Sequence, residues 1–429
     1  MKILILSQYW NPENGVPQRR WTWLTEELKH QGHEVLVLCP PPHYQRKVDL
    51  KTWFEQMLSN HPPRLEIGIS GEIVQRTPFL PASSSLTSRA LNQAVVAVGA
   101  LAHAIVPNSP ATKFQPDVVI GTVPALPTAF ITCLVARRFR CPFIIDLRDA
   151  WPELLEYSDV WNSGTGRRSL RERVLSLGAL QIVSRVTKIA LDYSLQHASG
   201  LIVTADRLGQ RLIDRLNKPA ERVITIRNVF PVETPLNLRH HELEPGALNV
   251  LYAGTIGRAQ DLENAVRAAK CAQDRGAKIS LRFVGAGATK EAVATLAREL
   301  GVSLSVEARR SADGLREVYE WADTALVQLA DWEPLAMAIP SKVYELMDMG
   351  IHISAVAQGE TADVIQSLRA GFVVPPHSPE ALADRWVKLA EAGENLVPAP
   401  RAQAWVQESR SETALRALTG LLSAVVRKP

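Results

Sequence analysis

Cysteine and long hydrophobic runs are scarce in this sequence. Its 429 residues include four cysteines, none of which pairs with another at metal-binding or redox spacing. Reduced thiols are therefore favoured over a disulfide framework. The apolar stretch at residues 94–106 is too short to span a bilayer, and the N-terminus becomes polar too early for a signal peptide. We therefore expect a protein that stays in the cytoplasm.

Two further absences exclude classes of function. No G-x-G-x-x-G motif follows the first predicted strand, and no acidic residue directly ends the second, which disfavours a dinucleotide-binding oxidoreductase. The net charge of +4 is modest, and no run of Lys and Arg is interleaved with aromatic residues. A nucleic-acid partner is not expected. The content of 46% hydrophobic and 21% charged residues is typical of a soluble globular protein, and the length suits two domains.

Strand and helix patterns alternate through the first half of the chain. Strand patterns at residues 2–7 and 33–39 flank a loop containing Gly15 and a helical pattern at 17–30. This order predicts a doubly wound α/β domain with a parallel sheet. It recurs later, with strands expected at 65–70, 72–77, 117–121, 142–146, 201–204 and 223–226. A largely apolar helix at 86–106 is either buried or dips into a membrane surface.

The second half repeats this alternation after a turn-rich, polar segment. Strands are expected at residues 249–253, 279–284, 302–307, 324–329 and 351–356, with helices between them. We predict two Rossmann-like domains, at 1–228 and 248–400, joined by a linker at 229–247 and followed by a helix at 402–426.

In the second half, three loops that each follow a predicted strand contain residues suited to binding a phosphate. The carboxyl ends of parallel strands meet at one edge of a sheet, so these loops should converge there. Glycine-rich turns and helix starts offer backbone N–H groups to an anion. The candidates are Gly257 and Arg258, then Gly285 and Gly287, then Ser341, Lys342 and Glu345. The alternative is that Ser341 only caps its helix, Lys342 is solvated and Glu345 favours the first turn.

In the first half, charged residues gather where the strand at 142–146 ends. Asp146, Arg148, Asp149 and Glu153 lie in the run DLRDAWPE, at the sheet edge that faces the ligand in such folds. We interpret them as functional rather than as packing residues. Gly15 could let the backbone approach a ligand closely, or could simply belong to a flexible loop.

A basic, amphipathic segment occupies residues 165–190. It either attracts an anionic lipid or pyrophosphate, or is a solvated helix face. Its basic residues are Arg167, Arg168, Arg171, Arg173, Arg185 and Lys188, against the single acid Glu172.

Several motifs resemble one enzyme family over residues 1–392. They are the Gly15 loop, DLRDAWPE at 146–153, IRN at 226–228, YAGTIG at 252–257, FVGAG at 283–287 and IPSKVYELMDMG at 339–350. The chain resembles the retaining glycosyltransferases of family 4, within the WbuB/WcaI-like branch of bacterial cell-surface polysaccharide enzymes. The resemblance implies a GT-B fold of two Rossmann-like domains facing a cleft, acceptor-binding first and nucleotide-sugar-binding second. It also implies that the C-terminal helix packs back on the first domain.

The resemblance also implies roles for the candidate residues. Glu345 would bind the ribose hydroxyls of the donor nucleotide, Arg258 and Lys342 would neutralise its diphosphate, and Gly15 would let a loop approach the phosphates. Arg148 and Asp149 would face the acceptor and the transferred sugar. No metal ion or other cofactor would be needed.

This chain departs from the family pattern at several positions. Met337 stands where most relatives carry a first glutamate, and Glu333, four residues earlier, is the candidate substitute. Thr255 and Gln260 replace the usual Arg and Lys of the phosphate loop. Many relatives have histidine at the position of Arg148.

We therefore expect a glycosyltransferase that uses a nucleotide-sugar donor, UDP-linked, and a saccharide or polyprenyl-diphosphate-linked acceptor. It would work at the cytoplasmic face of an anionic membrane, contacted through Arg167, Arg168, Arg171 and Arg173. Two alternatives stay open: a sugar-nucleotide 2-epimerase of GT-B fold and a non-catalytic nucleotide-sugar-binding subunit.

Overall fold

The chain divides into two compact units. The computed structural model describes residues 1–43, 53–54, 65–82, 86–156, 179–231, 238, 244–310, 312–392, 396 and 400–426. The first unit comprises residues 1–158, 167–230 and 412–429, and the second comprises 159–166 and 231–411. Each unit is an α/β fold built on its own sheet.

The first unit has an eight-stranded sheet in the order β3-β4-β2-β1-β5-β6-β7-β8. Its central strands form from short runs rich in Val, Ile and Leu, which are buried on both faces as a parallel sheet requires. The edge strand β3 is exposed. The strands are β1 (Lys2–Leu6), β2 (Glu34–Cys39), β3 (Leu65–Ile67), β4 (Ile73–Arg76), β5 (Val118–Val123), β6 (Phe143–Leu147), β7 (Gly200–Val203) and β8 (Val223–Thr225).

The edge strand β3 departs from the predicted parallel sheet. It pairs antiparallel with β4, with Leu65 opposite Gln75. The two strands are joined by a short turn in which Gly71 adopts a positive φ of 77°. A connection this short can reverse the chain but cannot cross the sheet, so the pair has to be antiparallel.

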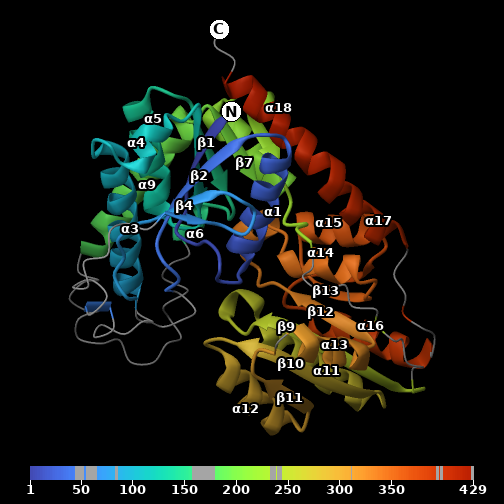
Figure 1. Ribbon diagram of the computed structural model, residues 1–429. Helices are drawn as coiled ribbons and strands as arrows, with labels where there is room; N and C mark the ends of the chain where they lie inside the picture. Colours follow the sequence, from blue (N-terminus) through green and yellow to red (C-terminus); the bar gives the residue numbers. More distant parts are fainter. Residues whose placement is uncertain are drawn as a thin grey trace. The chain divides into compact units, whose positions relative to one another are not determined.

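Helices cover both faces of this sheet. Figure 1 shows α3, α4, α5 and α9 on one side of it and α1 and α18 on the other. The helices are α1 (Val16–His30), α3 (Leu86–Ile105), α4 (Pro110–Phe114), α5 (Leu126–Phe139), α6 (Glu153–Glu156), α9 (Ala179–His197), α10 (Asp206–Leu216), the 3-10 turn η1 (Ala220–Arg222) and α18 (Ala414–Val426).

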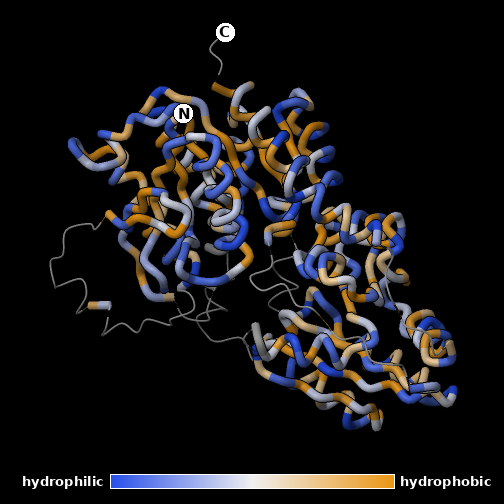
Figure 2. Tube along the Cα trace, turned by 45° about the vertical axis from the view of Figure 1, so that its right-hand side comes forward, coloured by the Kyte–Doolittle hydropathy of each residue, from blue (hydrophilic) through white to orange (hydrophobic). Residues whose placement is uncertain are grey.

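The second unit has a six-stranded, fully parallel sheet in the order β11-β10-β9-β12-β13-β14. Helices α11 and α12 pack beside α16 over one face, around the fully buried Trp386. The strands are β9 (Ala247–Thr255), β10 (Lys278–Ala286), β11 (Ser303–Glu307), β12 (Thr324–Gln328), β13 (Ile353–Val356) and β14 (Gly371–Val374). In the hydropathy colouring of Figure 2, orange stretches follow the strands and recur at intervals along the helices.

The helical elements of the second unit alternate with these strands. They are η2 (Arg258–Gln260), α11 (Leu262–Asp274), α12 (Lys290–Leu300), α13 (Ala312–Trp321), η3 (Glu333–Met337), α14 (Ser341–Asp348), α15 (Glu360–Ser367), α16 (Pro379–Ala392) and α17 (Pro400–Glu408).

The helix predicted at 402–426 is not one regular α-helix. A π-helical turn, η4 (Ser409–Thr413), separates α17 from α18. Helix α17 packs against α14 in the second unit, and α18 packs against β8 in the first. The division between the two units falls inside that turn, between Ser411 and Glu412.

Candidate functional site

The carboxyl edge of the first sheet carries the charged run that the sequence analysis singled out. Strand β6 ends at Leu147, so Asp146 lies inside the strand and Arg148 and Asp149 lie just beyond it. Their environments differ sharply, because Asp146 is completely buried while Asp149 is exposed to solvent.

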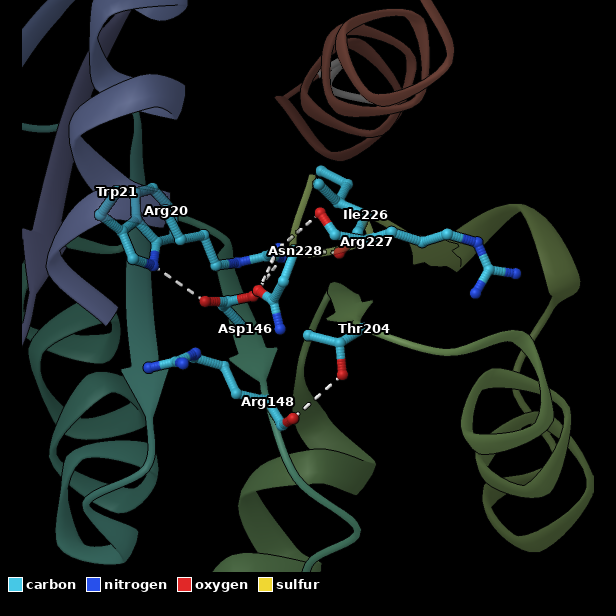
Figure 3. Close-up of polar contacts among 8 residues, drawn as sticks. All are labelled: Arg20, Trp21, Asp146, Arg148, Thr204, Ile226, Arg227 and Asn228. Atoms are coloured by element: carbon cyan, nitrogen blue, oxygen red, sulfur yellow. Dashed lines mark hydrogen bonds and ion pairs between the residues drawn. The ribbon is translucent and has the colours of Figure 1, made fainter. Parts of the chain in front are cut away.

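Asp146 is part of a buried ion pair and is not available to a ligand. Arg20 Nη2 contacts Asp146 Oδ1 at 3.0 Å, and neither side chain is exposed. Trp21 Nε1 donates a hydrogen bond to Asp146 Oδ2 at 2.8 Å. Figure 3 shows both partners reaching the aspartate from α1. The functional interpretation of Asp146 is therefore wrong, since its charge is matched by a structural partner.

Arg20 also anchors the chain where it leaves β8. Its Nη1 donates to Ile226 O at 2.8 Å and to Asn228 Oδ1 at 3.2 Å. The Arg227 side chain points away from this cluster (Figure 3) and pairs with Asp206 at 2.5 Å. Arg20 was not predicted from the sequence, although its spacing from Leu24 and Leu28 places it on the apolar stripe of α1. An arginine in such a stripe needs a buried carboxylate.

Glu153 likewise has structural partners. Its carboxylate contacts Arg215 Nη1 at 2.9 Å and Arg211 Nε at 3.8 Å, which ties the start of α6 to α10. The functional interpretation of Glu153 is therefore also replaced by a packing role. Arg148 and Asp149 are the charged residues of the run for which a ligand-facing role stays a prediction.

Arg148 has a guanidinium in which two hydrogen-bonding groups are without a partner among the described residues. Its backbone oxygen accepts a hydrogen bond from Thr204 Oγ1 at 3.0 Å. Its Nε and Nη1 atoms are buried and find no hydrogen-bond partner among the described residues. Desolvation lowers the pKa of Arg148, against the opposing attraction of Asp149 and Asp146. A buried donor without an acceptor is costly, which suits a group that meets an anionic or hydroxyl-bearing ligand.

Asp149 keeps solvent contact, yet the protein around it still perturbs its ionisation. Desolvation raises the pKa of Asp149, and the neighbouring Arg148 opposes that rise. A carboxyl group with a perturbed pKa, next in sequence to an arginine at the edge of a sheet, is a candidate functional group.

Gly15 lies at the start of α1. It is the N-cap residue with φ of −130°, an extended conformation open to any residue. A Cβ there would meet the flexible end of Gln18, at 2.6 Å from Oε1. No backbone strain therefore requires glycine at this position.

In the second unit, packing explains two of the candidate glycines. Gly285 pairs in register with Gly254 of β9, and a Cβ on it would lie 1.8 Å from Gly254 O. A Cβ on Gly287 would lie 2.0 Å from Ile256 O. Backbone oxygens cannot move aside as side chains can, so both positions need glycine whether or not a ligand binds. Gly257, the N-cap of η2, has an extended φ of −126° and shows no such constraint.

Hydrogen bonds join the predicted donor loops at the edge of the second sheet. Ile256 N donates to Ala286 O at 3.0 Å, which links the loops after β9 and β10. Ala330 N donates to Ala259 O at 2.8 Å, which links the loop after β12 to η2. Arg258, the first residue of η2, is half-buried in this region. The convergence expected from the strand order is therefore present.

Glu333 and Met337 lie in the same 3-10 turn, η3, with opposite exposure. Glu333 begins the turn and is exposed, whereas Met337 ends it and is 9% exposed. The end of the turn is held by the start of α15, where Thr361 Oγ1 donates to Ala338 O at 2.7 Å. Gly359, with φ of 67°, leaves room for Ala336 O, which would lie 2.1 Å from a Cβ. Neither support was predicted from the sequence.

Helix α14 begins differently from the prediction. Pro340 is its N-cap, and no side-chain hydrogen bond from the described residues caps the helix. The expectation that Ser341 is the cap is wrong, because Ser341 is the first helical residue. Lys342 Nζ contacts Glu345 Oε2 at 2.9 Å and Tyr319 OH of α13 at 3.1 Å. Lys342 and Glu345 are thus brought together, but as partners of each other.

Some sequence predictions lie outside the part of the chain that the structure describes. Arg167, Arg168, Arg171 and Arg173 are among them. None of the helices formed by the described residues is long and apolar enough to cross a membrane. These residues also contain no group of three or more His, Cys, Asp or Glu side chains that could hold a metal ion.

Comparisons with known proteins agree with this architecture. Residues 15–229 match the glycosyl transferase 4-like domain, and residues 247–392 match the glycosyl transferases group 1. WcaI of Escherichia coli (strain K12), a glycosyl transferase assigned to colanic acid biosynthesis, is 25% identical over 403 residues, covering 89% of this chain and 90% of WcaI.

Two solved structures share the fold over nearly the whole chain. Sucrose-phosphate synthase from Thermosynechococcus elongatus has a TM-score of 0.66 at 16% identity and covers 98% of each chain. HepE of Anabaena, solved with UDP and glucose, has a TM-score of 0.60 at 14% identity, covering 99% of this chain and 100% of HepE. Because the 4-like domain matches half of the sequence and the group 1 domain matches most of the second unit, the chain belongs to the family-4-like glycosyltransferases and has the GT-B fold.

Proposed function

We propose that this protein is a retaining glycosyltransferase which moves a sugar from a UDP-linked donor to a polyprenyl-diphosphate-linked saccharide in cell-surface polysaccharide synthesis. The observation that carries the proposal is the edge of the second sheet, where hydrogen-bonded loops after β9, β10 and β12 lead to the start of α14. Structures of HepE with UDP and the assignment of WcaI to colanic acid synthesis support the donor and the pathway class.

Different groups would hold the diphosphate and the ribose of the donor nucleotide. Arg258 and the backbone N–H groups at the start of α14, with Ser341 Oγ, suit the diphosphate. Glu345, one turn into the helix, suits the ribose hydroxyls because a carboxylate accepts hydrogen bonds. Gly15, Gly257, Gly285 and Gly287 would allow the chain to approach the donor closely. Glu333 is the proposed substitute for the glutamate missing at Met337.

The chemical step would depend on Arg148 and Asp149 and on stabilisation of the leaving group. Departure of UDP places negative charge on phosphate oxygens, and fixed cations and N–H groups stabilise such charge in the transition state. We propose that these groups suffice without a metal ion.

Calorimetric titration with UDP, GDP and ADP tests the donor site. We expect UDP to bind, and Glu345→Ala to weaken binding by about tenfold, or about 1.4 kcal/mol. The same affinity is expected in the presence of EDTA. Glu299→Ala, which removes an exposed glutamate from α12 in the same unit, is the matched control.

Equal UDP affinity in the two glutamate variants would contradict the ribose role of Glu345. Turnover separates transfer from 2-epimerisation, since a transferase releases UDP only when an acceptor is present.

A membrane-facing acceptor agrees with one surface of the first unit. Leu91, Val98 and Ile105, spaced by seven residues on α3, are 58%, 62% and 50% exposed. Val186 and Ile189 of α9 are similarly exposed. Both helices pack against α5, so these apolar residues share one side of the sheet (Figure 1). Of the two possibilities for residues 86–106, the buried helix therefore holds for one face of α3 only.

The charges on these helices favour an anionic surface. Helices α3, α4, α5 and α9 together contain one acidic residue, Asp192. Their basic residues are Arg89, Lys113, Arg137, Arg138, Arg185 and Lys188. Exposed apolar residues among basic ones are typical of peripheral membrane contact.

Co-sedimentation with phosphatidylglycerol vesicles tests this contact. Each basic residue near an anionic surface contributes about 1 kcal/mol. Changing Arg167, Arg168, Arg171 and Arg173 together to Ser should therefore weaken vesicle binding by at least about tenfold. Val98→Asp, which places a charge on the apolar stripe, should weaken it as well.

The matched control removes four basic residues from α11 and α12 of the second unit. It changes Arg267, Lys270, Lys290 and Arg298 to Ser. Unchanged sedimentation of both first-unit variants, or equal loss in the control, would refute the proposed membrane surface.

A further inference from the structure

Three polar side chains meet at the first turn of α14. Lys342 Nζ lies 2.9 Å from Glu345 Oε2 and 3.1 Å from the hydroxyl of Tyr319. The ammonium also lies over the Tyr319 ring, 5.8 Å from its centroid. Tyr319 comes from α13 and is 3% exposed, so it is held by packing. Lys342 is therefore held by Tyr319 on a neighbouring helix and by Glu345 on its own helix.

This geometry changes the expected role of Lys342. An ammonium has three donors, and two of them are directed to Tyr319 and Glu345. Its positive charge is already matched by the carboxylate proposed to bind ribose. A lysine that neutralised a diphosphate would instead extend its charge toward the ligand. The Lys342 and Glu345 side chains are only 28% and 17% exposed, so both are held within the protein surface.

The ionisation of Lys342 agrees with a permanent pair. Desolvation alone would lower its pKa, but interactions with Tyr319 and Glu345 outweigh it, and the pKa of Lys342 stands above its ordinary value. The Lys342 ammonium therefore stays charged at neutral pH.

The Lys342–Glu345 ion pair leaves one oxygen of the Glu345 carboxylate available. Glu345 Oε2 accepts from Lys342, while Oε1 makes no hydrogen bond to the described residues. A glutamate side chain is flexible when exposed, and fixing it beforehand removes part of the entropy lost on binding. A carboxylate held by one oxygen can present the other to two adjacent hydroxyls.

We infer that Lys342 is a positioning residue which, with Tyr319, orients the Glu345 carboxylate toward the ribose hydroxyls of the donor nucleotide. This inference rests on the proposed donor site. It differs from the role that the family resemblance implied, in which Lys342 contacts the diphosphate directly.

Comparing UDP with 2′,3′-dideoxy-UDP separates the two roles. The wild-type protein should bind UDP about tenfold more tightly, since hydrogen bonds to a charged group are strong. In Lys342→Met the affinity for UDP should fall by about tenfold. Its affinity for dideoxy-UDP should change by less than about twofold, so that discrimination between the nucleotides is lost. Calorimetry measures all of these constants.

Two further variants complete the test. Tyr319→Phe keeps the ring but removes the hydroxyl that holds Lys342, and should reduce discrimination in the same direction. Lys270→Met breaks a lysine–acid pair of similar type on α11, where Lys270 contacts Asp274 at 2.5 Å, and should alter neither constant. Thermal unfolding of each variant shows whether it is folded.

Three outcomes would overturn the inference. Equal weakening of UDP and dideoxy-UDP by Lys342→Met would place the lysine on the diphosphate. Unaltered UDP binding in that variant would deny it any role. A wild-type protein that binds UDP without discriminating against dideoxy-UDP would refute ribose recognition, whereas one that binds neither nucleotide would refute the proposed donor site itself.

Discussion

Arg20→Met is expected to destabilise the protein by about 3–5 kcal/mol, because it leaves the Asp146 carboxylate buried without its cation. Both side chains are completely buried, 3.0 Å apart. Arg20 also donates to Ile226 O and Asn228 Oδ1, so the substitution leaves further buried acceptors unpaired. The loss should appear in urea denaturation of the full chain, followed by far-UV circular dichroism.

Two controls separate the ion pair from a general effect of substitution. Arg89→Met removes an exposed arginine from α3 and should change the free energy of unfolding by less than about 0.5 kcal/mol. Arg20→Met combined with Asp146→Leu should recover part of the loss, because removing both charges is far less costly than removing one. A cost below about 1 kcal/mol for Arg20→Met alone would contradict the structural role.

Arg148→Gln is expected to lower kcat by about 100-fold while leaving UDP affinity unchanged, since removing one preorganised donor typically costs this much. Arg148 belongs to the first unit, whereas the proposed UDP site belongs to the second. The assay is release of UDP from UDP-sugars in the presence of a polyprenyl-diphosphate-linked saccharide. Because Nε and Nη1 of Arg148 are buried without a hydrogen-bond partner among the described residues, the substitution should not destabilise the protein.

The two arginines thus differ in a measurable way. Arg20→Met should reduce stability, whereas Arg148→Gln should reduce turnover at constant stability. This is expected of a residue that serves activity and does not stabilise the fold. Arg298→Gln, which removes an exposed arginine from α12 of the second unit, is the activity control. If Arg148→Gln retained full kcat, the proposed contact with the acceptor or the transferred sugar would be wrong.

The family and the layered architecture were predictable from the sequence. The run VVIGTV in β5 is buried throughout because its residues are almost all apolar, whereas in KISLRFVGA of β10 buried apolar residues alternate with less buried polar ones. Both patterns are local. The glycine-bearing loops that follow β9 and β10 are local as well. Strand order then places the loops at one sheet edge by topology.

Whether an individual charged side chain has a structural partner was not predictable in this way. Asp146 and Glu153 looked alike beside Asp149, but Asp146 meets Arg20 across 126 positions of sequence and Glu153 meets Arg215 across 62. Likewise, the hydroxyl that holds Lys342 comes from Tyr319, on a different helix.

The sequence by itself determined the family, the alternation of strands and helices, and the two sheets, parallel except for β3, because these depend on periodicity and on motifs of adjacent residues. Only the tertiary structure decided which charged side chains are structural and which are available to a ligand. A charge is neutralised by whatever lies within a few ångströms of it, and that neighbour is set by packing between distant segments.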